Sequence, residues 1–177
     1  MLDFIKNIFR KRYLRKAASN TATGLIPLSD IHSVALILDA EDNGSDECKD
    51  KAVAYFRSRG IRTSIFFFDF SKKSEDERQT TSLNNTILRK DLNWWGRPSE
   101  EKISMLMQDN ADMLISLVDN DDFPVDCMAK CSVSRFKIGR RQLRGRAFDL
   151  VIEDSAEHCP TPLEAFNEIT RYLESIA

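Results

Sequence analysis

The sequence predicts an α/β protein: a three-layer, Rossmann-like sandwich on a mostly parallel, five-stranded sheet, preceded by a basic amphipathic amino-terminal helix. Apolar runs at 34–38 and 63–68 flank a helical pattern at 47–59 that stops at Gly60. Such a strand, helix and strand almost always form a right-handed crossover between parallel strands. Strand-like and helix-like segments alternate to the carboxyl end, which favours one doubly wound domain over two.

The amino-terminal segment predicts a helix over residues 2–18. Leu2, Ile5 and Phe9 recur at helical spacing with Phe4 and Ile8 beside them, and cations occupy most other positions. The small, polar stretch that follows predicts a linker, so we expect a helix and linker over 1–24 and one Rossmann-like domain over 25–177. The cations assigned to an anionic partner here are Lys6, Arg10, Lys11, Arg15 and Lys16.

The remaining elements follow in order. The continuous Val/Ala/Leu/Ile run at 34–38 is typical of a central strand that is covered on both faces. Ser99 is suited to cap a helix that reaches about Asn110, and Thr161-Pro162 to begin the last helix. Further strands are expected at 113–118, 135–138 and 148–152, a helix at 123–131, and a polar loop at 71–85; a weaker strand pattern at 86–89 is not counted among the five.

Charge and composition exclude several classes of protein. The chain has 177 residues and a net charge of −2, yet residues 1–16 hold six Lys or Arg against one Asp. No apolar run approaches the ~20 residues of a membrane-spanning helix, and the four cysteines lack the spacing of a small secreted domain. We expect a cytoplasmic protein that can attach peripherally to a membrane.

Polar residues follow the strands at the sheet edge where open parallel sheets bind ligands. Asp39, Asp69, Asp119 and Asn120 lie there, with Asp154 after the last strand. The loop after the first strand lacks phosphate-binding glycine motifs. Its acids suit a cation, with Asp39 as nucleophile of a haloacid dehalogenase-type phosphotransferase, but Glu41 stands where that family has a second Asp. Strand-end acids commonly form turns or caps, so no catalytic residue and no cofactor are assigned.

Two further features have a structural and a functional interpretation. Cys127 and Cys131 share a helix face and could form a zinc site with His158 and Cys159, but their apolar surroundings favour buried thiols, so no metal is predicted. Adjacent tryptophans at 94–95 cannot both enter the core if the segment is extended, which leaves one ring exposed. Trp95 is taken as a candidate ligand platform, against a purely structural role.

The segment 135–146 holds six basic residues and no acid. A solvated loop paired with nearby acids is the structural interpretation; an anion site is the functional one. The candidate residues are Arg140, for a ligand at the sheet edge, and Arg141, Arg144 and Arg146, for an anionic partner.

Four segments distinguish the chain, at 90–98, 122–124, 136–140 and 148–152, and the most distinctive part is Asn-Trp-Trp-Gly at 93–96. With the basic helix, they resemble a small family of bacterial proteins of unknown function, found chiefly in Bacteroidetes. Residues 112–139 are similar to the amino-terminal domain of lipopolysaccharide heptosyltransferases. That second resemblance implies a shared Rossmann-like fold more than a shared reaction.

The sequence therefore predicts a non-enzymatic binding module that attaches to an anionic membrane surface or a protein partner through its basic helix. One alternative is an enzyme, either a metal-dependent phosphotransferase or a glycosyltransferase-like protein. Another is an RNA-binding protein, if the helix and the 135–146 segment form one positive face. A homodimer through the helix is a further alternative.

Overall fold

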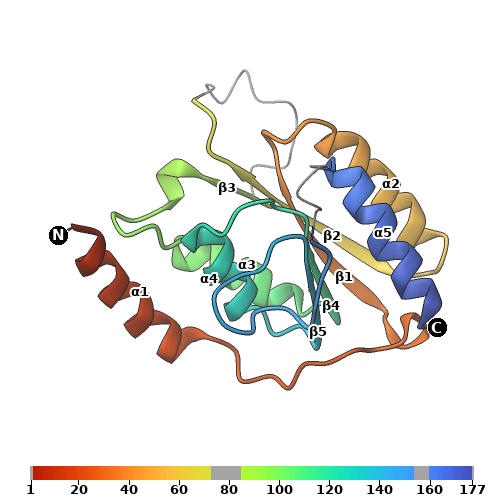
Figure 1. Ribbon diagram of the computed structural model, residues 1–177, viewed down its shortest axis with the longest axis horizontal. Coiled ribbons are helices and arrows are strands. Elements are labelled where there is room, and N and C mark those ends of the chain that lie inside the picture. Colours follow the sequence, from red (N-terminus) through yellow and green to blue (C-terminus); the bar gives the residue numbers. More distant parts are fainter. Residues whose placement is uncertain (1, 73–84, 154–159, 177) are drawn as a thin grey trace.

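The chain forms an α/β fold around one parallel sheet (Figure 1). The computed structural model describes residues 2–72, 85–153 and 160–176. These residues form a six-stranded, all-parallel sheet in the order β3-β2-β1-β4-β5-β6, the Rossmann order, which reverses between β1 and β4. The strands are β1 Ser33–Asp39, β2 Arg62–Asp69, β3 Thr86–Leu88, β4 Met113–Ser116, β5 Phe136–Gly139 and β6 Leu150–Val151.

The expectation of five strands is wrong by one, because residues 86–88 form β3. This strand has three residues and pairs with residues 67–69 at the carboxyl end of β2. A run this short carries too little periodicity to be told from a loop. The remaining predicted strands are confirmed within a few residues at either end, and the sheet is parallel throughout rather than mostly parallel.

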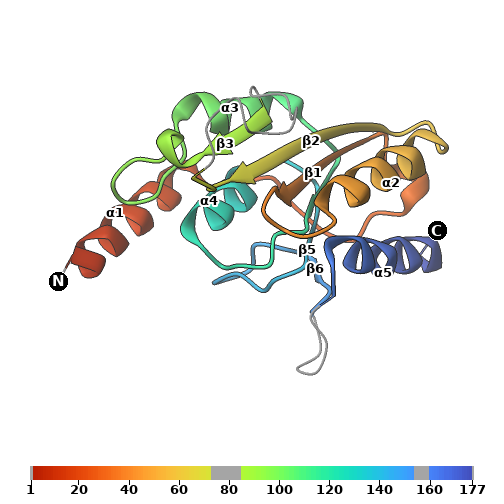
Figure 2. The ribbon, with the colours of Figure 1, turned by 90° about the horizontal axis from the view of Figure 1, so that it is seen from above.

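Five helices in the described residues cover the two faces of the sheet. They are α1 Leu2–Ala17, α2 Ser45–Arg57, α3 Glu100–Asp109, α4 Phe123–Cys131 and α5 Pro162–Ser175. Seen from above, α2 and α5 lie on one side of the sheet and α1, α3 and α4 on the other (Figure 2). The three-layer prediction is therefore confirmed.

Strand β1 shows why the sheet is buried on both faces. Its side chains alternate, with Val34, Leu36 and Leu38 in the core under α2 and α5, and Ala35 and Ile37 in the core under α3 and α4. All five are at most 1% exposed. A strand with two apolar faces needs the continuous apolar run seen in the sequence.

The helix caps also follow the sequence. The Ser99 hydroxyl accepts a hydrogen bond from the Lys102 N–H at the start of α3 (3.4 Å). At the start of α5, Thr161 and Glu164 form a reciprocal capping box. No helix in the described part of the chain is long and apolar enough to span a bilayer.

Candidate functional site

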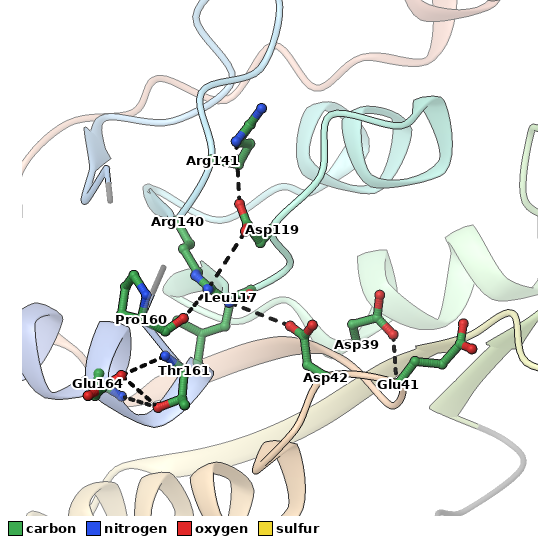
Figure 3. A network of polar contacts seen from close by, with 10 residues as sticks. All are labelled: Asp39, Glu41, Asp42, Leu117, Asp119, Arg140, Arg141, Pro160, Thr161 and Glu164. Carbon is green, nitrogen blue, oxygen red and sulfur yellow. Dashed lines mark hydrogen bonds and ion pairs between the residues drawn. The ribbon is translucent and has the colours of Figure 1, made fainter. Parts of the chain in front are cut away.

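Arg140 is the centre of a polar network at the carboxyl edge of the sheet (Figure 3). It directly follows β5, and its side chain is 3% exposed. Its guanidinium lies 3.5 Å from Asp42 Oδ2 and 3.8 Å from Asp119 Oδ2, and donates hydrogen bonds to the carbonyl oxygens of Leu117 (3.3 Å) and Pro160. Arg140 thus lies between the loops that follow β1 and β4, in the crevice where Rossmann-like sheets hold their ligands.

Three other polar residues at this edge, Asp39, Asp69 and Asn120, form turns. Asp39 Oδ1 accepts a hydrogen bond from the Glu41 N–H (2.9 Å), and Asp69 Oδ1 accepts one from the Ser71 N–H (3.0 Å). Asn120 Oδ1 accepts one from the Asp122 N–H (3.1 Å). In each case a side-chain oxygen holds the backbone two residues later, which is the structural role expected of strand-end Asp and Asn.

Burial changes the acidity of the carboxyl groups beside Arg140. It raises the pKa of Asp42, an effect that the Arg140 guanidinium opposes and the Asp119 carboxylate reinforces. Burial also raises the pKa of Asp39, where the Glu41 N–H opposes the shift and the carboxylates of Asp42, Glu41 and Asp69 add to it. In residues 2–72, 85–153 and 160–176, no three His, Cys, Asp or Glu side chains are grouped to hold a metal ion.

A small polar cavity of about 400 Å³ adjoins this network. Asp119, Arg140 and Arg141 line it together with Gln142. Arg141 lies 3.5 Å from Asp119 Oδ1, so both arginines share one carboxylate. Asp121 and Glu153 complete the lining, so three carboxylates offset the two guanidinium groups, which disfavours an anionic ligand at this position.

Most of the basic segment 135–146 is engaged internally. Lys137 is buried and donates to the carbonyl oxygens of Ala129 (2.9 Å) and Ser132 (2.7 Å). The arginines form ion pairs, Arg135 with Asp112 (2.9 Å), Arg146 with Asp149 (3.6 Å), and Arg140 and Arg141 with Asp119. Arg144 alone has no carboxylate within 4.0 Å in the described part of the chain. The structural interpretation therefore accounts for most of this charge run.

A second candidate surface lies on α1, where apolar side chains face outward. Eight large hydrophobic side chains are exposed in the described residues, and six of them belong to α1 or to Trp94 beside it. Phe4 is 70% exposed, Ile8 51% and Trp94 57%. We name this the α1 apolar surface: Leu2, Phe4, Ile5, Ile8, Phe9 and Trp94.

The carboxyl-terminal half of α1 attaches the helix to the domain. Tyr13, Leu14 and Ala17 pack against the core on the α3 and α4 side, although no residue of α1 is fully buried. Lys11, Arg15 and neighbouring cations on this half remain exposed. The predicted basic helix is confirmed, and its exposed apolar residues are concentrated in the half that projects from the domain.

The turn at residues 93–97, the tryptophan turn, also contacts α1. Arg10 Nε donates to the Trp95 carbonyl oxygen (2.7 Å), and the Phe9 ring lies 5.3 Å from the Trp94 ring, centroid to centroid. Gly96 has φ = +90°, and a Cβ there would lie 3.2 Å from an Arg10 nitrogen, so the turn requires glycine. One of the two rings is exposed, as the sequence predicts, although the segment is a turn rather than extended. The exposed ring is Trp94, whereas Trp95, the candidate ligand platform, is buried.

Cys127 and Cys131 lie fully buried in α4 beside Tyr13 of α1. The hydrogen bond between the thiols, together with burial, raises the pKa of Cys127. Burial likewise raises the pKa of Tyr13 to about 12. The raised pKa keeps the Cys127 thiol protonated, which supports a structural role for Cys127. The same hydrogen bond between the thiols lowers the pKa of Cys131. The other two proposed zinc ligands, His158 and Cys159, lie outside the described residues, as does Asp154.

Comparison with known proteins assigns the chain to a family. No curated protein and no solved structure matches it, so the similarity to heptosyltransferases stays a sequence-based prediction. A family model described as "Family of unknown function (DUF6913)" matches residues 4–176. The chain belongs to that family.

Proposed function

We propose that this member of the family is a non-enzymatic, Rossmann-like module that attaches to an anionic membrane surface through α1. The observation that carries the proposal is the α1 apolar surface, which gathers six of the eight exposed large hydrophobic side chains of the described residues. Contiguous exposed apolar side chains mark binding surfaces, whereas scattered ones are ordinary. Trp is also common where a protein meets the headgroup layer of a membrane.

The energies are sufficient for attachment. Full burial of a large apolar side chain is worth about 1.5–3 kcal/mol. With exposed fractions of 70% for Phe4 and 51% for Ile8, these two side chains alone contribute roughly 2–4 kcal/mol on entering the headgroup boundary. Each exposed cation of α1, such as Lys11 or Arg15, adds about 1 kcal/mol near anionic lipid. Apolar insertion and charge together supply the two signals that stable surface binding requires.

The enzyme and RNA-binding alternatives draw less support from the geometry. The crevice that would hold a substrate contains the Arg140 guanidinium, and Asp39 serves a turn. The basic segment that would hold RNA is mostly paired with acids or carbonyl oxygens, which leaves Arg144 to join the cations of α1. The homodimer alternative uses the same surface as membrane attachment and is distinguished by the experiment below.

Sedimentation with lipid vesicles tests the proposal. The full chain is mixed with vesicles of phosphatidylcholine alone, or of phosphatidylcholine with phosphatidylglycerol, and the pelleted fraction is measured. We expect binding to the anionic vesicles, and at least a tenfold loss in the variant Phe4→Ser/Ile8→Ser. Leu25→Ser/Met107→Ser is the matched control, because both residues are exposed but lie away from α1.

Three results would contradict the proposal. Equal pelleting with neutral and anionic vesicles would show that the cations of α1 do not contribute to binding. Equal binding by the two double variants would remove the role of the α1 apolar surface. A dimer in sedimentation equilibrium that Phe4→Ser/Ile8→Ser dissociates, in a chain that does not pellet with vesicles, would assign the surface to a second copy instead.

A further inference from the structure

We infer that the groove between α1 and the start of α4 binds a phosphate ester. The groove encloses a cavity of about 760 Å³, within the size range of small-molecule sites. Its walls come from α1, from α4, from the turn that contains Gly96 and from the loop after β5. This inference goes beyond surface attachment, because it concerns a cavity that a soluble ligand could also fill.

Four cations line this groove without forming an ion pair to any described residue, although carboxylates line it too. Arg10 and Lys11 come from α1, Arg89 from the turn after β3, and Arg144 from the loop after β5. None lies within 4.0 Å of a carboxylate oxygen in residues 2–72, 85–153 and 160–176, unlike the other arginines of the segment 135–146. Positive charges brought together from separate segments repel one another, and a bound anion offsets that repulsion.

Two of these cations are already held in place. Arg10 Nε donates to the Trp95 carbonyl oxygen, and its guanidinium lies 4.9 Å from the centre of the Phe123 ring. Arg89 donates to the Phe70 carbonyl oxygen through Nε (3.4 Å) and one terminal nitrogen (3.3 Å). A guanidinium that is oriented before the ligand arrives loses less conformational entropy on binding.

The carboxylates of the groove indicate which kind of phosphate compound it can bind. Asp126 is neutralised by Lys130 (2.6 Å), and Asp3 lies 3.9 Å from Lys6. Asp121 and Asp122 remain as hydrogen-bond acceptors at the start of α4. These two acids disfavour a bare polyphosphate and favour a phosphate ester that carries a hydroxyl or amine donor. Either a lipid headgroup or a soluble ester has this chemistry.

Calorimetric titration of the full chain tests the site. The probes are glycerol 3-phosphate, glycerol as the control without phosphate, and a short-chain phosphatidylglycerol below its micelle concentration. Lys11→Gln/Arg144→Gln removes two exposed groove cations. Arg57→Gln/Arg171→Gln is the matched control, since it removes two exposed cations, on α2 and α5, that lie neither in the groove nor on α1.

We expect the wild type to bind glycerol 3-phosphate but not glycerol. Lys11→Gln/Arg144→Gln should weaken binding at least tenfold, and Arg57→Gln/Arg171→Gln should leave it unchanged. Tighter binding of the short-chain lipid than of glycerol 3-phosphate identifies a headgroup as the source, and the reverse order identifies a soluble ester.

The proposed site would be wrong if neither phosphate probe bound, or if the two double variants weakened binding of glycerol 3-phosphate equally. Vesicle pelleting that persists without phosphate-ester binding would reject the groove and leave membrane attachment standing. Binding of glycerol 3-phosphate without vesicle pelleting would reject membrane attachment and leave the groove standing.

Discussion

Replacement of Arg140 by Met should destabilise the protein far more than the same change at Arg141. Both guanidinium groups approach Asp119, but the Arg140 side chain is 3% exposed and the Arg141 side chain 56%. Arg140→Met removes a donor from the Leu117 carbonyl oxygen and a partner from Asp42 and Asp119. Those two carboxylates are 33% and 26% exposed, so we expect a loss of about 2–4 kcal/mol, less than the roughly 3–5 kcal/mol of a fully buried pair. An exposed pair is worth about 0–1 kcal/mol. The two substitutions therefore separate the buried network from an ordinary surface pair.

Urea denaturation and thermal melting of the two variants measure this difference. At about 2–4 °C per kcal/mol for a chain of this length, Arg140→Met should lower Tm by roughly 4–16 °C, and Arg141→Met by less than about 4 °C. Circular dichroism follows both transitions. Equal losses in the two variants, or a loss below about 1 kcal/mol for Arg140→Met, would refute the assignment of Arg140 as the buried centre of the network.

Two further predictions concern Asp39 and the docking of α1. Asp39→Asn should raise the free energy of unfolding at about pH 7, and by progressively less toward pH 4. Burial raises the folded-state pKa of Asp39, so the stability that its carboxyl group contributes when protonated is lost as pH rises through that pKa. A gain in stability that grows toward pH 4 in urea denaturation would contradict this prediction. Tyr13→Ala should make Cys131 reactive to a thiol reagent, because it removes the α1 side chain beside that thiol. Peptide mass mapping should find Cys48, which is buried in α2, still protected; an unchanged labelling rate at Cys131 would show that Tyr13 does not cover it.

The sequence carries strong signals for the centre of the fold and weak ones for its edges. Strand β1 is predictable because both of its faces are buried, which demands a continuous apolar run. The helix at 123–131 is predicted with the observed bounds. At the edges, β3 has three residues and β6 has two, so neither shows a period long enough to define its limits.

The candidate sites depend on contacts between distant segments. The turn roles of Asp39 and Asn120 are predictable, because their partners lie two residues away. By contrast, Arg140 pairs with Asp42 across 98 positions, and Arg10 contacts Trp95 across 85. Arg140 and Arg10 are candidate site residues in the sequence because they lie in basic segments. The sequence does not predict their partners, and it does not predict that Arg89 lies in the groove. Such pairings emerge only when the sheet brings the loops together.

The contact between Phe9 and Trp94 also determines how the domain can be oriented. Since α1 and the tryptophan turn present their exposed rings together, attachment through this surface, as proposed above, would involve two different parts of the chain. Two points of contact remove the free rotation that a single tethered helix would allow. The layer formed by α2 and α5, on the opposite side of the sheet from α1, would then face away from the surface (Figure 2). The proposed attachment would thus present the α2 and α5 face of the domain toward the solution.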